Sequence, residues 1–110
     1  NENTIEMQEE FKVMLLNRAN KVIGVYEASA GGLTGTVADP RLILAAAIKS
    51  LAVSIILSHN HPSGNLKPSR ADEELTQKIK AAASYHDIKV IDHIIITSEG
   101  YYSFADEGVL

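Results

Sequence analysis

The chain has 110 residues, of which 45% are hydrophobic and 22% charged, and its formal net charge is −4 at neutral pH. This length and this balance predict a single domain, residues 1–110, with a hydrophobic core of its own. Cysteine is absent, which excludes disulfide frameworks, thiolate zinc fingers and cysteine nucleophiles. The acidic balance argues against a broad basic surface for nucleic acids. The sequence contains no apolar run of the length that a membrane span needs.

The first part of the chain predicts a β-hairpin followed by a helix. Residues 1–8 are polar and acidic, unlike a secretory signal, so we expect a cytoplasmic protein whose first residues are flexible or the remnant of an upstream region. Residues 11–16 and 22–26 are apolar runs separated by a polar turn, which is typical of a hairpin. After a glycine-rich loop at residues 31–36, Asp39 is expected to cap a helix. Its buried face is expected to carry the apolar side chains at helical spacing, Leu44, Ile48 and Leu51.

The second part predicts a central strand, a second helix and the remaining strands. Residues 53–58 are short, β-branched and mostly apolar, as expected of a strand buried on both faces. A polar loop follows from about residue 59 to 68, and a second helix begins near Ser69. The last strands are expected at residues 89–91 and 94–96 (as one strand or two) and at 101–104. The order β-β-α-β-α-β-β predicts an α/β fold with a mixed sheet flanked by helices.

Three side chains at the end of the central strand have the chemistry of metal ligands. In extended chain His59 and His61 point to the same side, and Asp72 falls in the first turn of the following helix. Two imidazoles and one carboxylate suit catalytic zinc, but also non-haem iron. The alternative is structural: the histidines are ordinary polar residues at a strand end, and Ser69 with Asp72 forms an N-terminal capping box.

The spacing of these residues resembles a known motif. His59-x-His61-Pro62, six residues, and then Ser69-x-x-Asp72 match the JAMM motif of the MPN/JAB metalloprotease superfamily, and the run from His59 to Gly64 resembles the RadC family of bacterial proteins. The resemblance implies a curved mixed sheet flanked by helices. It also implies one zinc ion per chain, held by His59, His61 and Asp72.

The same resemblance implies a hydrolytic mechanism and two further residues. A glutamate on an early strand is expected to take a proton from the metal-bound water, which attacks the carbonyl of a peptide or isopeptide bond. Glu10, immediately before Phe11 at the start of the first strand, matches that place best, and Glu9 is its nearest competitor. Because strand alternation places the two on opposite faces, only one of them can serve. Glu6 and Glu27 are weaker candidates. Ser69 is expected to help hold the developing oxyanion.

A second function stays open at this point. The RadC name suggests a non-catalytic metal-binding module acting in DNA repair or recombination, although the acidic balance speaks against direct DNA contact by this domain. A purely structural metal site is a third alternative, and it would have four protein ligands. The expected partner is a peptide or protein substrate, and homodimerisation through a sheet edge stays open. Asp92 and His93 are interpreted as a polar pair at a strand end, with support of the metal ligands or a partial metal site as the alternative.

Overall fold

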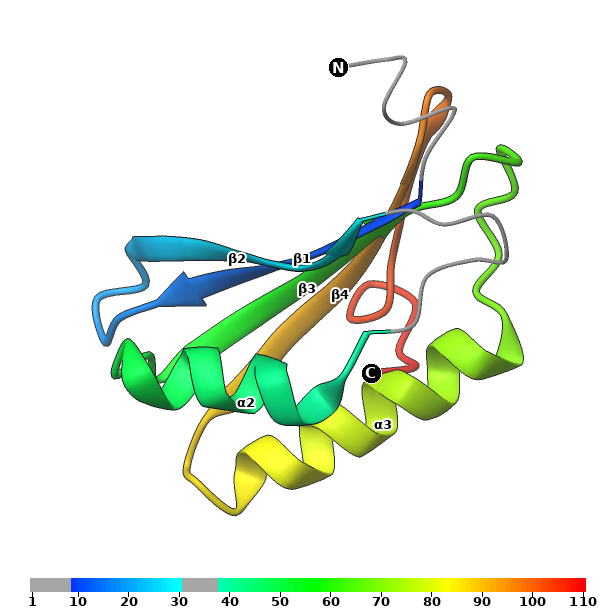
Figure 1. Ribbon diagram of the computed structural model, residues 1–110. Helices are drawn as coiled ribbons and strands as arrows, with labels where there is room; N and C mark the ends of the chain where they lie inside the picture. The colour runs from blue at the N-terminus through cyan, green and yellow to red at the C-terminus, as the bar shows by residue number, and fades with distance from the viewer. Residues whose placement is uncertain (1–8, 31–37) are drawn as a thin grey trace.

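The computed structural model describes residues 9–30 and 38–110 (Figure 1). The expectations for residues 1–8, for Glu6 and for the glycine-rich loop at 31–36 lie outside the described residues. No helix in the described part of the chain has the length and the apolar run that crossing a membrane would need.

The described elements follow the predicted order. They are β1 (Glu10–Leu16), β2 (Val22–Ala30), α2 (Pro40–Lys49), β3 (Ser54–Asn60), α3 (Arg70–Ser84), β4 (Lys89–Thr97) and β5 (Gly100–Ser103). The strands form one sheet in the order β2-β1-β3-β4-β5. Strands β3 and β4 are parallel, and the other neighbouring pairs are antiparallel. This confirms the prediction of an α/β fold with a mixed sheet.

The hairpin of β1 and β2 closes on a turn that the sequence marks clearly. The Asn17 side chain accepts hydrogen bonds from the backbone N–H groups of Ala19 (2.9 Å) and Lys21 (3.0 Å). Asn20 has a φ of 60°, a left-handed conformation that asparagine tolerates better than most residues. The turn therefore forms from local interactions and fixes where β2 begins.

The two helices of the described residues, α2 and α3, lie on the same face of the sheet (Figure 1). Alternate residues of β1 and β3 point toward them and form the core with buried side chains of α2 and α3. On β3 this inward row begins with Ile55 and Leu57, both fully buried, and continues with His59. The side of β3 that contributes Ile55 and Leu57 to the core therefore also carries His59, near the C-terminal end of the strand.

One prediction about the first helix is wrong. Its N-cap is Asp39, whose side chain accepts from the Arg41 backbone N–H, as expected. Ile48 and Leu51, however, are 45% and 81% exposed. The helix ends at Lys49, and its buried side chains are Ile43, Leu44 and Ala47. The buried row of Ile43, Leu44 and Ala47 lies on a neighbouring side of the helix from Ile48, and Leu51 lies beyond the end of the helix with a φ of 59°.

Strand β3 continues two residues farther than predicted. It ends at Asn60, so His59 is still part of the sheet. The His61 backbone N–H then donates to the Ile96 carbonyl on β4 (3.0 Å). Both histidines are thus held by the backbone of the sheet, which positions side chains more firmly than a free loop does.

The central position of β3 predicts a clear difference between two substitutions of the same kind. Ile55→Ala empties part of the core and should lower the free energy of unfolding by about 2–5 kcal/mol. Ile23→Ala, on the edge strand β2 where Ile23 is 45% exposed, should cost less than about 1 kcal/mol. Urea unfolding followed by circular dichroism measures both. Equal losses would contradict the assignment of β3 to the centre of the core.

Candidate metal centre

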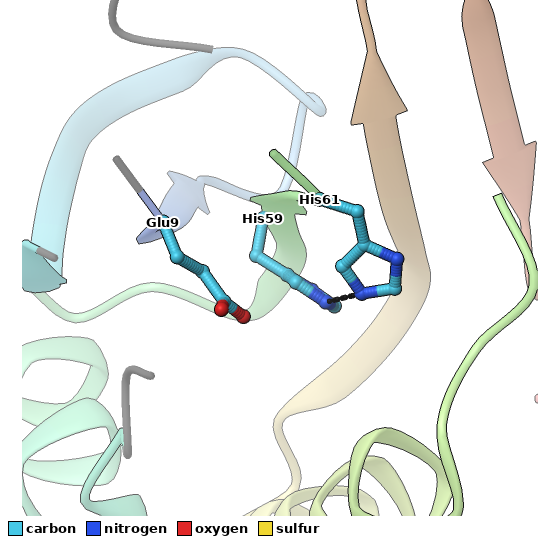
Figure 2. Close-up of side chains that lie close together, drawn as sticks. All are labelled: Glu9, His59 and His61. Carbon is cyan, nitrogen blue, oxygen red and sulfur yellow. Dashed lines mark hydrogen bonds between the residues drawn. The ribbon is translucent and has the colours of Figure 1, made fainter. Parts of the chain in front are cut away.

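His59 and His61 meet through their ring nitrogens at the end of β3. The Nε2 atoms of the two rings lie 2.9 Å apart (Figure 2). His59 is 3% exposed, and its ring stacks on that of Phe11 from β1, with centroids 5.6 Å apart and an interplanar angle of 9°. His61 is partly exposed at the edge of the site. One ring is therefore fixed by packing, and the other lies between the core and solvent.

Asp72 reaches both histidines from the first turn of α3. Its Oδ1 lies 3.3 Å from Nε2 of His59, and its Oδ2 lies 3.2 Å from Nε2 of His61. The carboxylate is held by a capping box, since the Ser69 backbone N–H donates to Asp72 Oδ2 (2.8 Å) and the Asp72 backbone N–H donates to Ser69 Oγ (3.0 Å). Capping and convergence on the histidines therefore occur together, on the same carboxylate.

Glu9 lies beside the histidines, whereas the family resemblance favoured Glu10 for this place. One carboxylate oxygen of Glu9 lies within 4.8 Å of a ring nitrogen of both His59 and His61, and Figure 2 shows its side chain directed toward the His59 ring. The reason is strand alternation: Phe11 faces the core opposite His59, and Glu9, two residues earlier, shares that side. Glu10 follows the opposite phase, and its backbone N–H donates to the Asn60 side chain (2.6 Å).

The proton positions on the two histidines follow from their outer partners. His61 Nδ1 lies 2.7 Å from the Asn65 carbonyl oxygen, which can only accept, so Nδ1 carries the hydrogen. His59 Nδ1 lies 2.7 Å from Nε2 of His93. His93 is fully buried, and burial lowers its pKa to about 3, so its ring is neutral. His93 in turn contacts Thr76, a contact that no local sequence pattern indicates.

Hydrogen-bond acceptors and a negative charge lie close together at the centre. Hydrogen bonding to Asp72 raises the pKa of His61 above its usual value. Burial acts to raise the pKa of the Asp72 carboxyl, but the His59 and His61 rings beside it and the hydrogen bond from the Ser69 backbone hold that pKa well below its ordinary range. When both imidazoles are neutral, two bare Nε2 atoms and a carboxylate face one point. Such a point calls for a proton or a metal cation, and these donors suit zinc.

A pocket opens beside these side chains. It has a volume of about 430 Å³, and its lining includes Glu9, His61, Ser69 and Asp72 together with the loop that joins β3 to α3. A larger pocket of about 590 Å³ lies between α3 and β4, around Lys80 and Lys89, and none of the residues of the centre lines it. The smaller pocket is the one that gives a ligand access to the centre.

Comparison with known proteins identifies the family of the chain. The family model described as a RadC-like JAB domain matches residues 1–109. The chain is 50% identical over 101 residues to a UPF0758 protein of Flavobacterium johnsoniae and 49% identical over 104 residues to one of Porphyromonas gingivalis, with 92% and 94% of this chain covered.

These matches cover 44% and 46% of the two relatives. A UPF0758 protein of Variovorax paradoxus is 43% identical over 102 residues, which is 93% of this chain and 45% of the relative. The chain thus spans less than half the length of the curated relatives that it matches. The family match over nearly the whole chain and the identity to these relatives lead to one conclusion: the chain belongs to the RadC-like JAB domain family.

Proposed function

We propose that this domain is a zinc-dependent hydrolase of peptide or isopeptide amide bonds. The observation that carries the proposal is the convergence of His59 Nε2, His61 Nε2 and the Asp72 carboxylate, with a glutamate beside them and a pocket in front. JAB-domain membership supports metallohydrolase chemistry as the general class.

The residues proposed to hold the metal are His59, His61 and Asp72, and with three protein ligands a zinc ion would be able to take a further, non-protein ligand. Zinc bound there would polarise a carbonyl oxygen and lower the pKa of a coordinated water toward 7. The carbonyl of Asn65 holds the Nδ1 hydrogen of His61, so the opposite nitrogen of that ring is the one presented to a cation. Such outer hydrogen bonds fix the orientation of histidine ligands.

Glu9 takes the role of general base in this proposal, in place of Glu10. Its carboxylate lies beside both histidines and lines the pocket, so it can accept the proton of the attacking water and return it to the leaving amine. Ser69 lines the same pocket, and its Oγ accepts from the Asp72 backbone N–H. That bond uses an oxygen lone pair and leaves the hydroxyl hydrogen for a developing oxyanion.

The substrate proposed is a peptide or protein rather than a nucleic acid. The net charge of −4 does not favour phosphate contacts. A glutamate beside the centre adds negative charge that a nucleic-acid backbone would meet with repulsion. A module for DNA repair without catalysis is the competing function, and it would not need a base next to the ligands.

Two neighbouring carboxylates provide a matched test of the base. Glu9→Gln should reduce hydrolysis of a peptide library by zinc-loaded protein about 10²–10⁴-fold, because the proton acceptor is lost. Glu10→Gln should leave the rate close to that of the unchanged protein. Zinc content, measured by elemental analysis, should be the same in all three proteins.

The opposite pattern, with activity lost only in Glu10→Gln, would return the base to Glu10. Absence of chelator-sensitive cleavage by the unchanged zinc-loaded protein, together with salt-dependent DNA binding, would favour the repair module instead.

The pKa of His61 predicts how zinc and protons compete. Its raised folded-state pKa stabilises the metal-free protein at pH below the ordinary histidine value, and this contribution is lost as the pH rises through the raised pKa. Zinc must displace that proton, so the stabilisation that zinc confers should grow with pH, by about 1.4 kcal/mol per unit for each proton displaced.

Thermal unfolding with and without excess zinc, at about pH 5.5 and pH 8, measures this effect. Asp72→Asn should remove most of the zinc-dependent shift, and magnesium, which prefers oxygen ligands, serves as the control cation. A zinc shift of equal size at both pH values would contradict the involvement of His61.

A further inference from the structure

A continuous chain of hydrogen bonds lies behind His59, on the side away from the pocket. His59 Nδ1 lies 2.7 Å from Nε2 of His93, and Nδ1 of His93 lies 2.5 Å from Oγ1 of Thr76. The Thr76 hydroxyl donates to the backbone carbonyl of Asp72 (2.7 Å). This series of hydrogen bonds starts at His59, one proposed ligand, and ends on the backbone of Asp72, another. It therefore links the end of β3 to the first turn of α3 through β4.

The donor and the acceptor of each hydrogen bond follow from the last one, between the Thr76 hydroxyl and the Asp72 carbonyl. Thr76 has one hydroxyl hydrogen, and the Asp72 carbonyl takes it, so Thr76 Oγ1 must accept from His93 Nδ1. His93 is fully buried, which favours a neutral ring. A neutral ring with its hydrogen on Nδ1 has no hydrogen on Nε2. That nitrogen can only accept, and the hydrogen between the two histidines therefore belongs to His59 Nδ1. The Nε2 of a neutral His59 is then bare, facing His61 and Asp72.

His93 is itself held rigidly. Its ring stacks on Phe104 with centroids 4.6 Å apart and an interplanar angle of 14°, and it meets Phe11 edge-on at 5.5 Å. The neighbouring Asp92 carboxylate accepts from the His93 backbone N–H (2.7 Å) and from Ser103 Oγ (2.5 Å). Ser103 at the end of β5 and Phe104 after it thus hold β4 at His93. Asp92 and His93 lie in the middle of β4, so the prediction of a polar pair at a strand end is wrong.

We propose that His93 is a positioning residue for the metal centre, which keeps the proton of His59 on Nδ1 and so presents the Nε2 lone pair to a divalent cation. Thr76 determines which nitrogen of His93 carries the hydrogen, because its hydroxyl oxygen accepts from His93 Nδ1. The inference rests on the proposed function in one respect only, which is that His59 acts as a ligand. Neither His93 nor Thr76 lines the pocket of the centre, so both act through His59.

The reverse arrangement would have a different consequence. If His93 donated from Nε2, His59 would carry its hydrogen on Nε2, pointing at His61 Nε2 and at the Asp72 carboxylate. The hydrogen would then occupy the place of the cation, and zinc would bind only after the whole chain of hydrogen bonds had rearranged.

The first test reads the tautomer directly in the unchanged, metal-free protein. Long-range ¹H–¹⁵N NMR of ring-labelled histidine at about pH 8, well above the ordinary pKa of histidine, should show His59 protonated on Nδ1 and bare on Nε2. A His59 ring protonated on Nε2 would overturn the proposal. This measurement depends on neither zinc nor hydrolysis, so its result stands whatever happens to the proposed activity.

The second test measures zinc affinity by competition with a chromophoric chelator. His93→Phe keeps a ring against Phe104 but removes both nitrogens, and it should weaken zinc binding about 10–100-fold. His93→Gln places an amide oxygen near the lost Nε2, where it can accept from His59, and should recover most of that loss. His86→Phe is the matched control, at an exposed position in the turn that follows α3, and the zinc affinity of this variant should be unchanged.

Thr76→Val keeps the shape of the buried side chain and covers the case in which His93→Phe fails to fold. It should weaken zinc binding by up to about ten-fold and raise the share of the other His59 tautomer. Unchanged affinity and an unchanged tautomer in Thr76→Val, or in a folded His93→Phe, would overturn the proposal. Loss of hydrolysis in every protein, with the tautomer and affinity pattern intact, would count against the proposed activity and not against this inference.

Discussion

The structure depends most on one electrostatic constraint: acceptor atoms from two separate elements are directed at a single point. Nε2 of His59 and Nε2 of His61 lie 2.9 Å apart, and the Asp72 oxygens lie 3.2 and 3.3 Å from them. Bare imidazole nitrogens and a carboxylate repel one another unless a positive charge lies between them. A protonated imidazole can supply that charge, and so can a divalent metal ion, which makes proton and metal competitors for the same place.

The fold meets this constraint with ordinary structural elements. Period-two alternation on β3 aligns His59 with the buried row of Ile55 and Leu57, and the same alternation on β1 brings Glu9 to that side. The capping box of α3, a common way to begin a helix, orients the Asp72 carboxylate. The pocket lies where the central strand ends and the helix begins, the usual place for ligands in α/β sheets.

Much of the fold and of the candidate site could be predicted from the sequence, because both depend on local sequence patterns. Element order follows from apolar runs and caps, and the convergence of His59, His61 and Asp72 agrees with their spacing. The choice between Glu9 and Glu10 depends on strand phase. The alternation of Phe11, Val13 and Leu15 with Lys12 and Met14 carries that phase, and extending it back by one residue pair indicates Glu9.

Other features could not be predicted from local patterns. The buried face of α2 depends on which side of the helix meets the sheet and on where the helix ends, and Ser50 gives no strong stop signal. The link between His59 and His93 depends on how β4 packs beside β3 in parallel, a pairing between residues 34 positions apart. Thr76 reads as an ordinary helix residue, and only the folded structure places it against His93. The contacts of His93 with His59 and Thr76 join residues far apart in the sequence, and no periodic pattern of residues indicates them.

The most direct test of the account is to locate the metal itself. Crystals of the zinc-loaded protein, measured on both sides of the zinc absorption edge, should show one anomalous peak per chain, bonded to Nε2 of His59, Nε2 of His61 and a carboxylate oxygen of Asp72 at about 2.0–2.2 Å. An anomalous peak elsewhere, or none at this point under conditions that saturate the protein with zinc, would contradict the assignment of a metal centre.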